Sequence, residues 1–384
     1  MTASVAAGLS GDSGWILTAA TLVVAGLLLV PGWIVGRSAR LAALPSLAVA
    51  PALSSAIIAA AEILAHALAL PWLPWGWAVI AGLTAVVALM ARLIVGAPPE
   101  RARRAASQGR AEWVILAAGL TVAVAVPAGV ILTVLPGPGY PAQVFDATFH
   151  LNAVAAIREG GNASMLGGLS ALYSGRAVYY PTVWHGAVAL APGSPAPVST
   201  AGVLALTAVV WPLSLLGLLA RAAGLDAARA SETDRARRRQ RTCAVAAVLA
   251  LSAAVVGFPL LPMTALAVWP YALSVAGLPG VLVLYDLLRR GTASRRLRLV
   301  LVLLALAAAG GVVAAHGTGL FNLAVLSPPF LVNLLVSRWR RSATRRGGRA
   351  LLVAGAVASV LVLAVGAWVM RASLASVLGY QRPA

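Results

Sequence analysis

Residues Val144 to Asn162 read V-F-D-A-T-F-H-L-N-A-V-A-A-I-R-E-G-G-N, and this stretch divides the apolar parts of the chain. It contains Asp146, His150, Arg158 and Glu159, whereas the sequence around it is almost entirely hydrocarbon. Ionisable groups are costly inside a bilayer. We therefore expect this stretch to lie at a membrane surface, between the spans that precede it and those that follow.

The composition is that of a polytopic membrane protein. Of the 384 residues, 61% are hydrophobic and only 10% are charged, and the mean hydropathy is +0.92. The net charge is +19, and all 29 basic residues are arginine. These arginines lie in short loops between apolar runs, which indicates anchoring on the cytoplasmic side and not nucleic-acid binding. The single cysteine, Cys243, excludes an intrachain disulfide and a metal cluster held by cysteines.

Runs long enough to cross a bilayer predict an all-α protein with about ten transmembrane helices. They cover approximately residues 15–35, 47–70, 77–95, 112–135, 198–220, 243–261, 271–288, 299–315, 320–336 and 350–370. With the N-terminus outside, all five arginine-rich loops fall on the cytoplasmic side of the cell membrane. Residues 136–197 then form an external loop, so the active face would be extracytoplasmic.

The ten predicted spans divide the chain into three regions. Residues 1–111 form an N-terminal extension of three membrane helices, and residues 112–371 form the core with the external loop. Residues 372–384 begin a possible external C-terminal region. Within the external loop, residues 183–191 are too short to cross a membrane.

The external loop carries a second polar cluster, R-A-V-Y-Y-P-T-V-W-H, from Arg176 to His185. An aspartate beside an apolar groove at the outer interface can act as a general base for a hydroxyl acceptor. Arginine and histidine side chains nearby can neutralise a phosphate leaving group. Because nucleotide sugars are absent outside the cell, an external group transfer needs a lipid-borne activated donor.

The fourth span, an outward turn and then Asp146, Ile157, Glu159, Gly161 and Asn162 resemble the first external loop of the type C (GT-C) glycosyltransferases. The chain departs from that pattern because Ala147 stands in place of a second acid and His150 in place of an aromatic residue. With D-A-x-F-H-x-N and Y-P-x-x-W-H, the chain also resembles uncharacterised actinobacterial multi-pass membrane proteins. The resemblance covers about residues 112–371.

This resemblance implies an inverting transfer of a sugar from a polyprenyl-phosphate donor to a glycan or glycolipid acceptor of the cell envelope, with Asp146 as the base. His150 would assist in catalysis. The candidates for binding phosphate or sugar are Arg158, Glu159, Arg176, Tyr179, Tyr180, Trp184, His185 and His316, of which the tyrosines and the tryptophan could stack on sugar rings or on the prenyl chain. Asp146 and His150 could also hold a divalent metal, although two ligands make a weak site.

Simpler interpretations remain open for these residues. Asp146 could only cap its helix, and Tyr179, Tyr180 and Trp184 could belong to an interfacial aromatic belt. Glu62 and His66, four residues apart in the second span, could form a buried hydrogen bond, or could relay protons in a transporter or flippase. A non-catalytic scaffold for envelope assembly is a third possibility.

Overall fold

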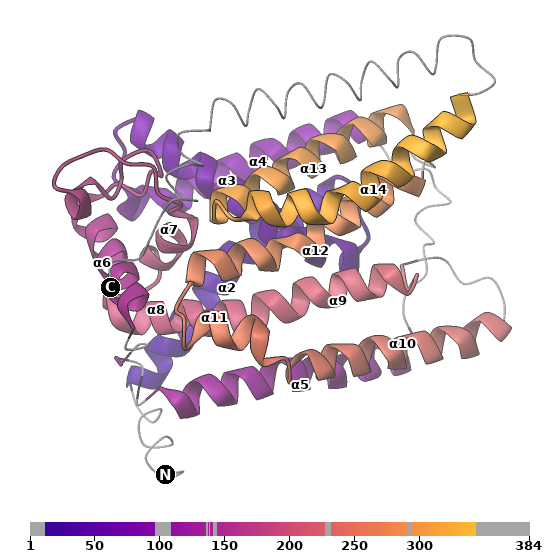
Figure 1. The fold of residues 1–384 in the computed structure, drawn as a ribbon, viewed down its shortest axis with the longest axis horizontal. Coiled ribbons are helices and arrows are strands. Elements are labelled where there is room, and N and C mark those ends of the chain that lie inside the picture. Colours follow the sequence, from indigo (N-terminus) through magenta and orange to yellow (C-terminus); the bar gives the residue numbers. More distant parts are fainter. Residues whose placement is uncertain are drawn as a thin grey trace. The chain divides into compact units, whose positions relative to one another are not determined.

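The computed structural model describes residues 12–96, 109–135, 137, 139–140, 144–226, 232–290 and 294–342. Within these ranges every regular element is a helix, as the composition predicts (Figure 1). The α-helices are α2 (Asp12–Ser38), α3 (Ala43–Ala67), α4 (Trp72–Val95), α5 (Arg110–Val134), α6 (Phe145–Gly160), α7 (Val183–Ala189), α8 (Pro195–Leu204), α9 (Trp211–Ala222), α10 (Glu232–Ser252), α11 (Leu261–Met263), α12 (Trp269–Arg290), α13 (Arg295–Ala315) and α14 (Gly319–Ser342). A short 3-10 helix, η2 (Ser170–Tyr173), and two π-helical segments, η3 (Ala205–Val210) and η4 (Val256–Leu260), complete the set.

The chain is an all-α polytopic membrane protein. Seven of the described helices are long and apolar enough to span a bilayer: 14–38, 43–67, 72–95, 110–134, 195–222, 269–290 and 295–315. They match the first five, the seventh and the eighth predicted spans. The sixth is a pair of helices, 235–252 and 256–263, bent by 50° at the break between them, and Gly257 and Pro259 lie just after that break.

The last two predicted spans have different outcomes. The ninth corresponds to α14, whose apolar part Gly319–Phe330 is shorter than a bilayer requires. The tenth lies outside the described residues. The chain divides into two compact units, residues 1–324 and 325–384, and the features below belong to the first.

Helix α3 lies at the centre of the first unit, where it packs against α2, α4, α9, α12 and α13. Glycines of three neighbouring helices press directly on its backbone. A side chain at Gly217, Gly280 or Gly311 would overlap main-chain atoms of α3 between Leu44 and Ala56. Small residues let helices approach closely in membranes, where burying apolar surface adds little. This packing explains why helices from the predicted N-terminal extension and from the predicted core form a single unit.

Charged and aromatic side chains gather at opposite ends of the helices. At one end, Arg221 of α9 binds Asp286 of α12 at 2.9 Å, and Arg289 and Arg290 bind the same carboxylate. At the other end, α12 begins at Trp269, and α6, α7 and α8 gather there (Figure 1). The polar residues singled out between 146 and 185 all belong to this second end.

Candidate functional site

Asp146 lies in the first turn of α6 and is half-buried. The residue that caps this helix is Val144, so the expectation that Asp146 is the N-cap is wrong. Its carboxylate takes part in no hydrogen bond or ion pair with other described residues, and its charge acts on Tyr180. A carboxylate in the first turn is favoured by the helix dipole. Asp146 is therefore held in place by its helix while its oxygens stay free.

His150, one turn further along α6, is buried and meets His185 of α7. Nδ1 of His150 lies 2.9 Å from Nε2 of His185, so one imidazole donates a hydrogen bond to the other. Trp184 and Trp269 pack around His150, with ring centroids at 6.1 and 5.2 Å. The predicted spacing of Asp146 and His150 on one helical face holds, but the partner of His150 comes from a distant part of the sequence.

The environment keeps both histidines neutral. Burial lowers the pKa of His150 to about 4, opposed by the carbonyl of Ala267 and assisted by the charge of His316. Burial and the neighbouring His150 lower the pKa of His185 well below its ordinary value, although the carbonyl of Pro181 acts in the opposite direction. Neutral imidazoles do not neutralise a phosphate by charge. The pair can orient a group or pass a proton, and the predicted phosphate contact by His150 or His185 would have to be a neutral hydrogen bond.

The helix α7 that carries His185 is short and completely buried. Two side chains from neighbouring spans contact it. The hydroxyl of Thr182 donates to Oε2 of Glu62 at 2.8 Å, and the indole Nε1 of Trp72 donates to the carbonyl of Gly186 at 2.9 Å. Glu62 is therefore part of this end of the molecule. His66 is exposed and forms no hydrogen bond with Glu62, so the expected Glu62–His66 bond is wrong.

Arg158 binds the end of the same helix. Its Nε donates to the carbonyl of Ala189 at 3.0 Å, and its two terminal nitrogens donate to the carbonyls of Ala191 and Gly193. Ala189 is the last residue of α7, and Ala191 and Gly193 follow it. At such an end, helices leave carbonyl acceptors without intrahelical partners. Each of the three nitrogens of Arg158 donates to one of these carbonyls, so in this structure the side chain holds the end of α7. Its predicted contact with the substrate stays a prediction.

The other candidate residues differ in exposure. Glu159, Arg176 and Tyr179 are exposed, and their side chains form no hydrogen bond or ion pair with other described residues. Tyr180 is half-buried, with its ring 5.7 Å from that of His185. Burial, Tyr173 and the charge of Asp146 raise the pKa of Tyr180, so its hydroxyl stays protonated.

Trp184 and His316 complete the predicted set. Trp184 is fully buried, with its ring 4.9 Å from Trp269, which places it in the core instead of an interfacial belt. His316 follows α13 and is half-buried; its Nδ1 lies 2.7 Å from the hydroxyl of Thr318 and its ring lies 5.9 Å from Tyr271. Its electrostatic effect on His150 brings His316 to the same end as Asp146 and His185.

A family model matches residues 25–384, from within α2 to the last residue. The chain belongs to the DUF6541 family, a family of unknown function. No curated protein and no solved structure matches it. The match covers the histidine pair, Asp146 and all the residues that hold α7. The match also covers all of α3 and α4, and α2 from residue 25 onward. These are the three helices that were predicted to form an added N-terminal extension, so the DUF6541 family model includes much of that region.

Three residues of the site were missed by the sequence analysis: Trp269, Thr182 and Gly186. Trp269 contacts His150, Thr182 binds Glu62, and Gly186 accepts from Trp72. The only sequence signal for Trp269 was its place between the sixth and seventh predicted spans, 243–261 and 271–288. No local pattern links Thr182 or Gly186 to α3 or α4, which are more than 100 residues away.

The expected metal site lacks a third ligand within the described part of the chain. No group of three or more His, Cys, Asp or Glu side chains is placed there to hold an ion. Asp146 and His150 remain two candidate ligands, and Nδ1 of His150 is already engaged with His185.

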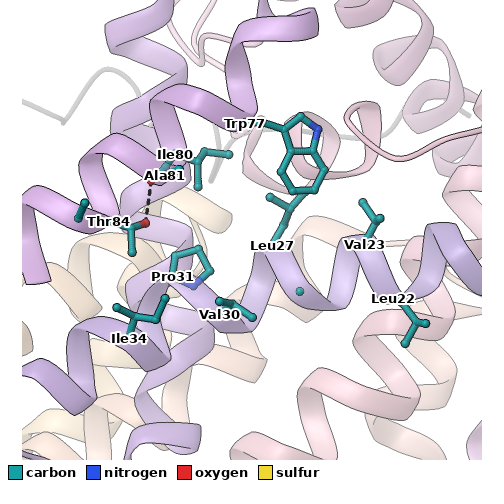
Figure 2. A pocket seen from close by; sticks show the side chains of 12 residues that line it. Leu22, Val23, Leu27, Val30, Pro31, Ile34, Trp77, Ile80, Ala81 and Thr84 are labelled. Atoms are coloured by element: carbon teal, nitrogen blue, oxygen red, sulfur yellow. Dashed lines mark hydrogen bonds between the residues drawn. The ribbon is translucent and has the colours of Figure 1, made fainter.

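An apolar groove of about 470 Å³ lies between α2 and α4 (Figure 2). Its lining is Leu22, Val23, Gly26, Leu27, Val30, Pro31 and Ile34 of α2, with Trp77, Ile80, Ala81, Thr84 and Ala85 of α4. The hydroxyl of Thr84 is bound to the carbonyl of Ile80 at 2.7 Å, so the groove offers hydrocarbon contacts only. Asp146, His185 and His316 do not line it. This groove is therefore not the apolar groove expected beside Asp146.

Proposed function

We propose that this protein is an integral membrane glycosyltransferase. It transfers a sugar from a polyprenyl-phosphate donor to a glycan or glycolipid acceptor on the outer face of the cell membrane, with inversion at the anomeric carbon. The observation that carries the proposal is the carboxylate of Asp146, which is half-buried in the first turn of α6, one turn from a buried pair of neutral histidines, and has no hydrogen-bond or ion-pair partner among the residues that the structure describes. A carboxylate in such a position is available to a substrate hydroxyl.

In the proposed reaction the acceptor hydroxyl loses its proton to Asp146 while its oxygen attacks the anomeric carbon of the donor sugar. The bond between that carbon and the phosphate oxygen breaks, and polyprenyl phosphate leaves with the electron pair. Two groups can hydrogen-bond to the phosphate: Tyr180, whose hydroxyl remains protonated and feels the charge of Asp146, and His316, which acts electrostatically on His150. The histidine pair fixes the position of α6 relative to α7.

The membrane orientation is supported by the charge distribution. The arginine-rich ends, where Arg221, Arg289 and Arg290 surround Asp286, are typical of the cytoplasmic side. Asp146 belongs to the opposite end, and we therefore place it outside. A donor on that side must already carry an activated leaving group, as a sugar linked to polyprenyl phosphate does.

The groove between α2 and α4 supports a lipid donor. Trp77, at its outer end, lies about one helical turn beyond Trp72, which contacts α7. The start of α4 is beside the C-terminal end of α6, because the amide of Trp72 donates to the carbonyl of Gly161. Asp146 is at the other end of α6. We therefore assign the groove to isoprene units that are remote from the phosphate of a long chain.

The test is transfer by purified protein in liposomes with a panel of synthetic decaprenyl-phosphate pentoses and hexoses, followed by mass spectrometry of released decaprenyl phosphate. Asp146→Asn removes the base with little change of shape, and we expect a loss of about 100-fold or more. Asp226→Asn, at the arginine-rich end, is the control and should retain the wild-type rate. Equal rates for Asp146→Asn and wild type, or no release from any donor, would refute the proposal.

A further inference from the structure

Glu62 belongs to a membrane span, but its carboxyl group faces the short helix of the site. It is 1% exposed. Oε2 accepts the hydroxyl hydrogen of Thr182, the residue directly before α7, at 2.8 Å. Oε1 lies against Gly186, and a side chain at that position would overlap it. The carboxyl group thus spans the first turn of α7.

Helix α7 depends on such contacts for its position. A helix of seven residues is too short to be stable by itself. At its C-terminal end, Arg158 binds the carbonyls of Ala189, Ala191 and Gly193. At its N-terminal end, Glu62 binds Thr182. Arg158 and Glu62 therefore hold the helix from both ends.

His185 lies between the two residues that contact Glu62. Thr182 and Gly186 are one turn apart, and His185 immediately precedes Gly186. Its hydrogen bond to His150 is 2.9 Å long, and a displacement of about 1 Å would break it. The position of α7 therefore decides whether the histidine pair forms.

We infer that Glu62 is a positioning residue for the His150–His185 pair, acting through Thr182 and Gly186 of α7. Its effect on sugar transfer rests on the proposed function, whereas its effect on the histidine pair does not. An apolar side chain could fill the same space but could not accept the hydroxyl hydrogen of Thr182. Glutamine can, through its carbonyl oxygen.

His66 offers an internal comparison. It lies one turn beyond Glu62 on α3, but it is exposed and does not bind Glu62. A general disturbance of α3 would affect His66 as well as the pair. An effect transmitted through α7 would reach His185 and His150 and leave His66 unchanged.

The chain has only four histidines, which makes the pair directly observable. We would incorporate [15N]histidine into the full chain, reconstitute it in bilayers, and record imidazole signals by solid-state NMR. The wild type should show a correlation through the His150–His185 hydrogen bond, assigned with His150→Gln and His185→Gln. The variants are Glu62→Ala, Glu62→Gln, Thr182→Val and Ser214→Ala. Ser214 is the matched control because it is also buried and bonds across helices, to the carbonyls of Ala48 and Ala276, but at the inner part of α3.

We expect Glu62→Ala and Thr182→Val to lose the correlation between the paired histidines while the His66 signal stays in place. Glu62→Gln and Ser214→Ala should keep it. Thr182→Val removes only a hydroxyl, so it remains informative if Glu62→Ala does not fold. Retention of the correlation in a folded Glu62→Ala or Thr182→Val protein would overturn the inference, as would its loss in Ser214→Ala.

The same variants separate this inference from the proposed function. If the protein is a transferase, Thr182→Val should lower kcat by up to about 100-fold, the cost of a misplacement of about 1 Å, with little change in KM. An unchanged kcat with a broken histidine pair would show that the pair is dispensable for transfer; Glu62 would still position the pair, and Asp146 would still be the base. If no transfer is found at all, the proposed function fails, and the NMR result alone decides whether Glu62 positions the pair.

Discussion

Nδ1 of His150 and Nε2 of His185 share a hydrogen bond of 2.9 Å between two helices that are separated by a loop in the sequence. The contact links α6, which carries Asp146, to α7, which is held by α3 and α4. Both rings are buried, and burial lowers the pKa of His150 to about 4 and that of His185 well below its ordinary value. The folded state therefore favours the neutral form of both imidazoles.

This relationship predicts that acid destabilises the protein. In the unfolded chain a histidine has a pKa of about 6.5. As the pH falls below that value, the unfolded state takes up protons before the folded state does, so the free energy of unfolding decreases. For His150 the loss between pH 6.5 and 4 is up to about 3 kcal/mol. Burial also lowers the pKa of His316, which adds to the effect.

The measurement is thermal unfolding in detergent between pH 7.5 and 4.5. The double variant His150→Gln/His185→Gln should be less stable than wild type at pH 7.5 but should show a shallower dependence on pH. His66→Gln, at an exposed position, is the control and should keep the wild-type slope. If the melting temperature of the double variant depends on pH as steeply as that of the wild type, the buried pair is not the cause of the acid destabilisation.

The close approach of Gly186 to Glu62 predicts a strong coupling between the two positions. A side chain at 186 would overlap Oε1 of Glu62. Gly186→Ala should therefore cost about 1–3 kcal/mol of unfolding free energy, as overpacking does. In a Glu62→Ala background the methyl group has room, and the cost should fall close to zero. A double-mutant cycle by chemical unfolding measures this, and additive effects would contradict it.

Arg158 predicts a stability effect where the sequence resemblance implied substrate binding. Its three nitrogens bind carbonyls at the end of α7, so Arg158→Ala should cost about 1–3 kcal/mol because these carbonyls lose a charged donor. Arg158→Lys should recover only part of the loss, because lysine lacks the forked geometry. Arg176→Ala, at an exposed arginine, should change stability by less than about 0.5 kcal/mol. Equal melting temperatures for Arg158→Ala and Arg176→Ala would refute the assignment.

Hydropathy predicted the fold well because it depends on long apolar runs and not on specific partners. The start of α5 at Arg110 and the end of α12 at Arg289 and Arg290 were also predictable, because arginines mark the ends of these apolar runs. The break in the sixth span was less evident, although Gly257 and Pro259 mark it.

The site was predicted only in part, because local spacing names neighbours along a helix but not across the fold. Asp146 and His150 were placed correctly on one face of one helix. Glu62 was paired with His66 by the same reasoning, yet its partner Thr182 is 120 residues away. The contacts of Arg158 could not be predicted for the same reason. The local sequence does not distinguish an arginine that binds the end of another helix from one that faces solvent.

The proposed orientation predicts opposite labelling of two serines. Ser174 lies in the loop at the end of the molecule where Asp146 lies, and Ser294 precedes α13 at the arginine-rich end; both are exposed. In a Cys243→Ser background, Ser174→Cys should react with a membrane-impermeant maleimide in intact cells. Ser294→Cys should react only after lysis. The reverse pattern would place Asp146 in the cytoplasm and remove the basis of an external transferase.

The apolar groove predicts where a lipid donor is held. Gly26 lines the groove, and a side chain added there would enter open space, so Gly26→Leu should fill part of it without disturbing the fold. Gly82 of α4 is the matched control, since it also faces open space but does not line the groove. In nanodiscs containing a photoreactive decaprenyl phosphate, Gly26→Leu should reduce cross-linking to α2 and α4 by about tenfold, equivalent to about 1.4 kcal/mol of binding free energy. Gly82→Leu should cross-link like wild type. Labelling that is equal in the two variants would mean that the donor chain lies elsewhere on the bundle.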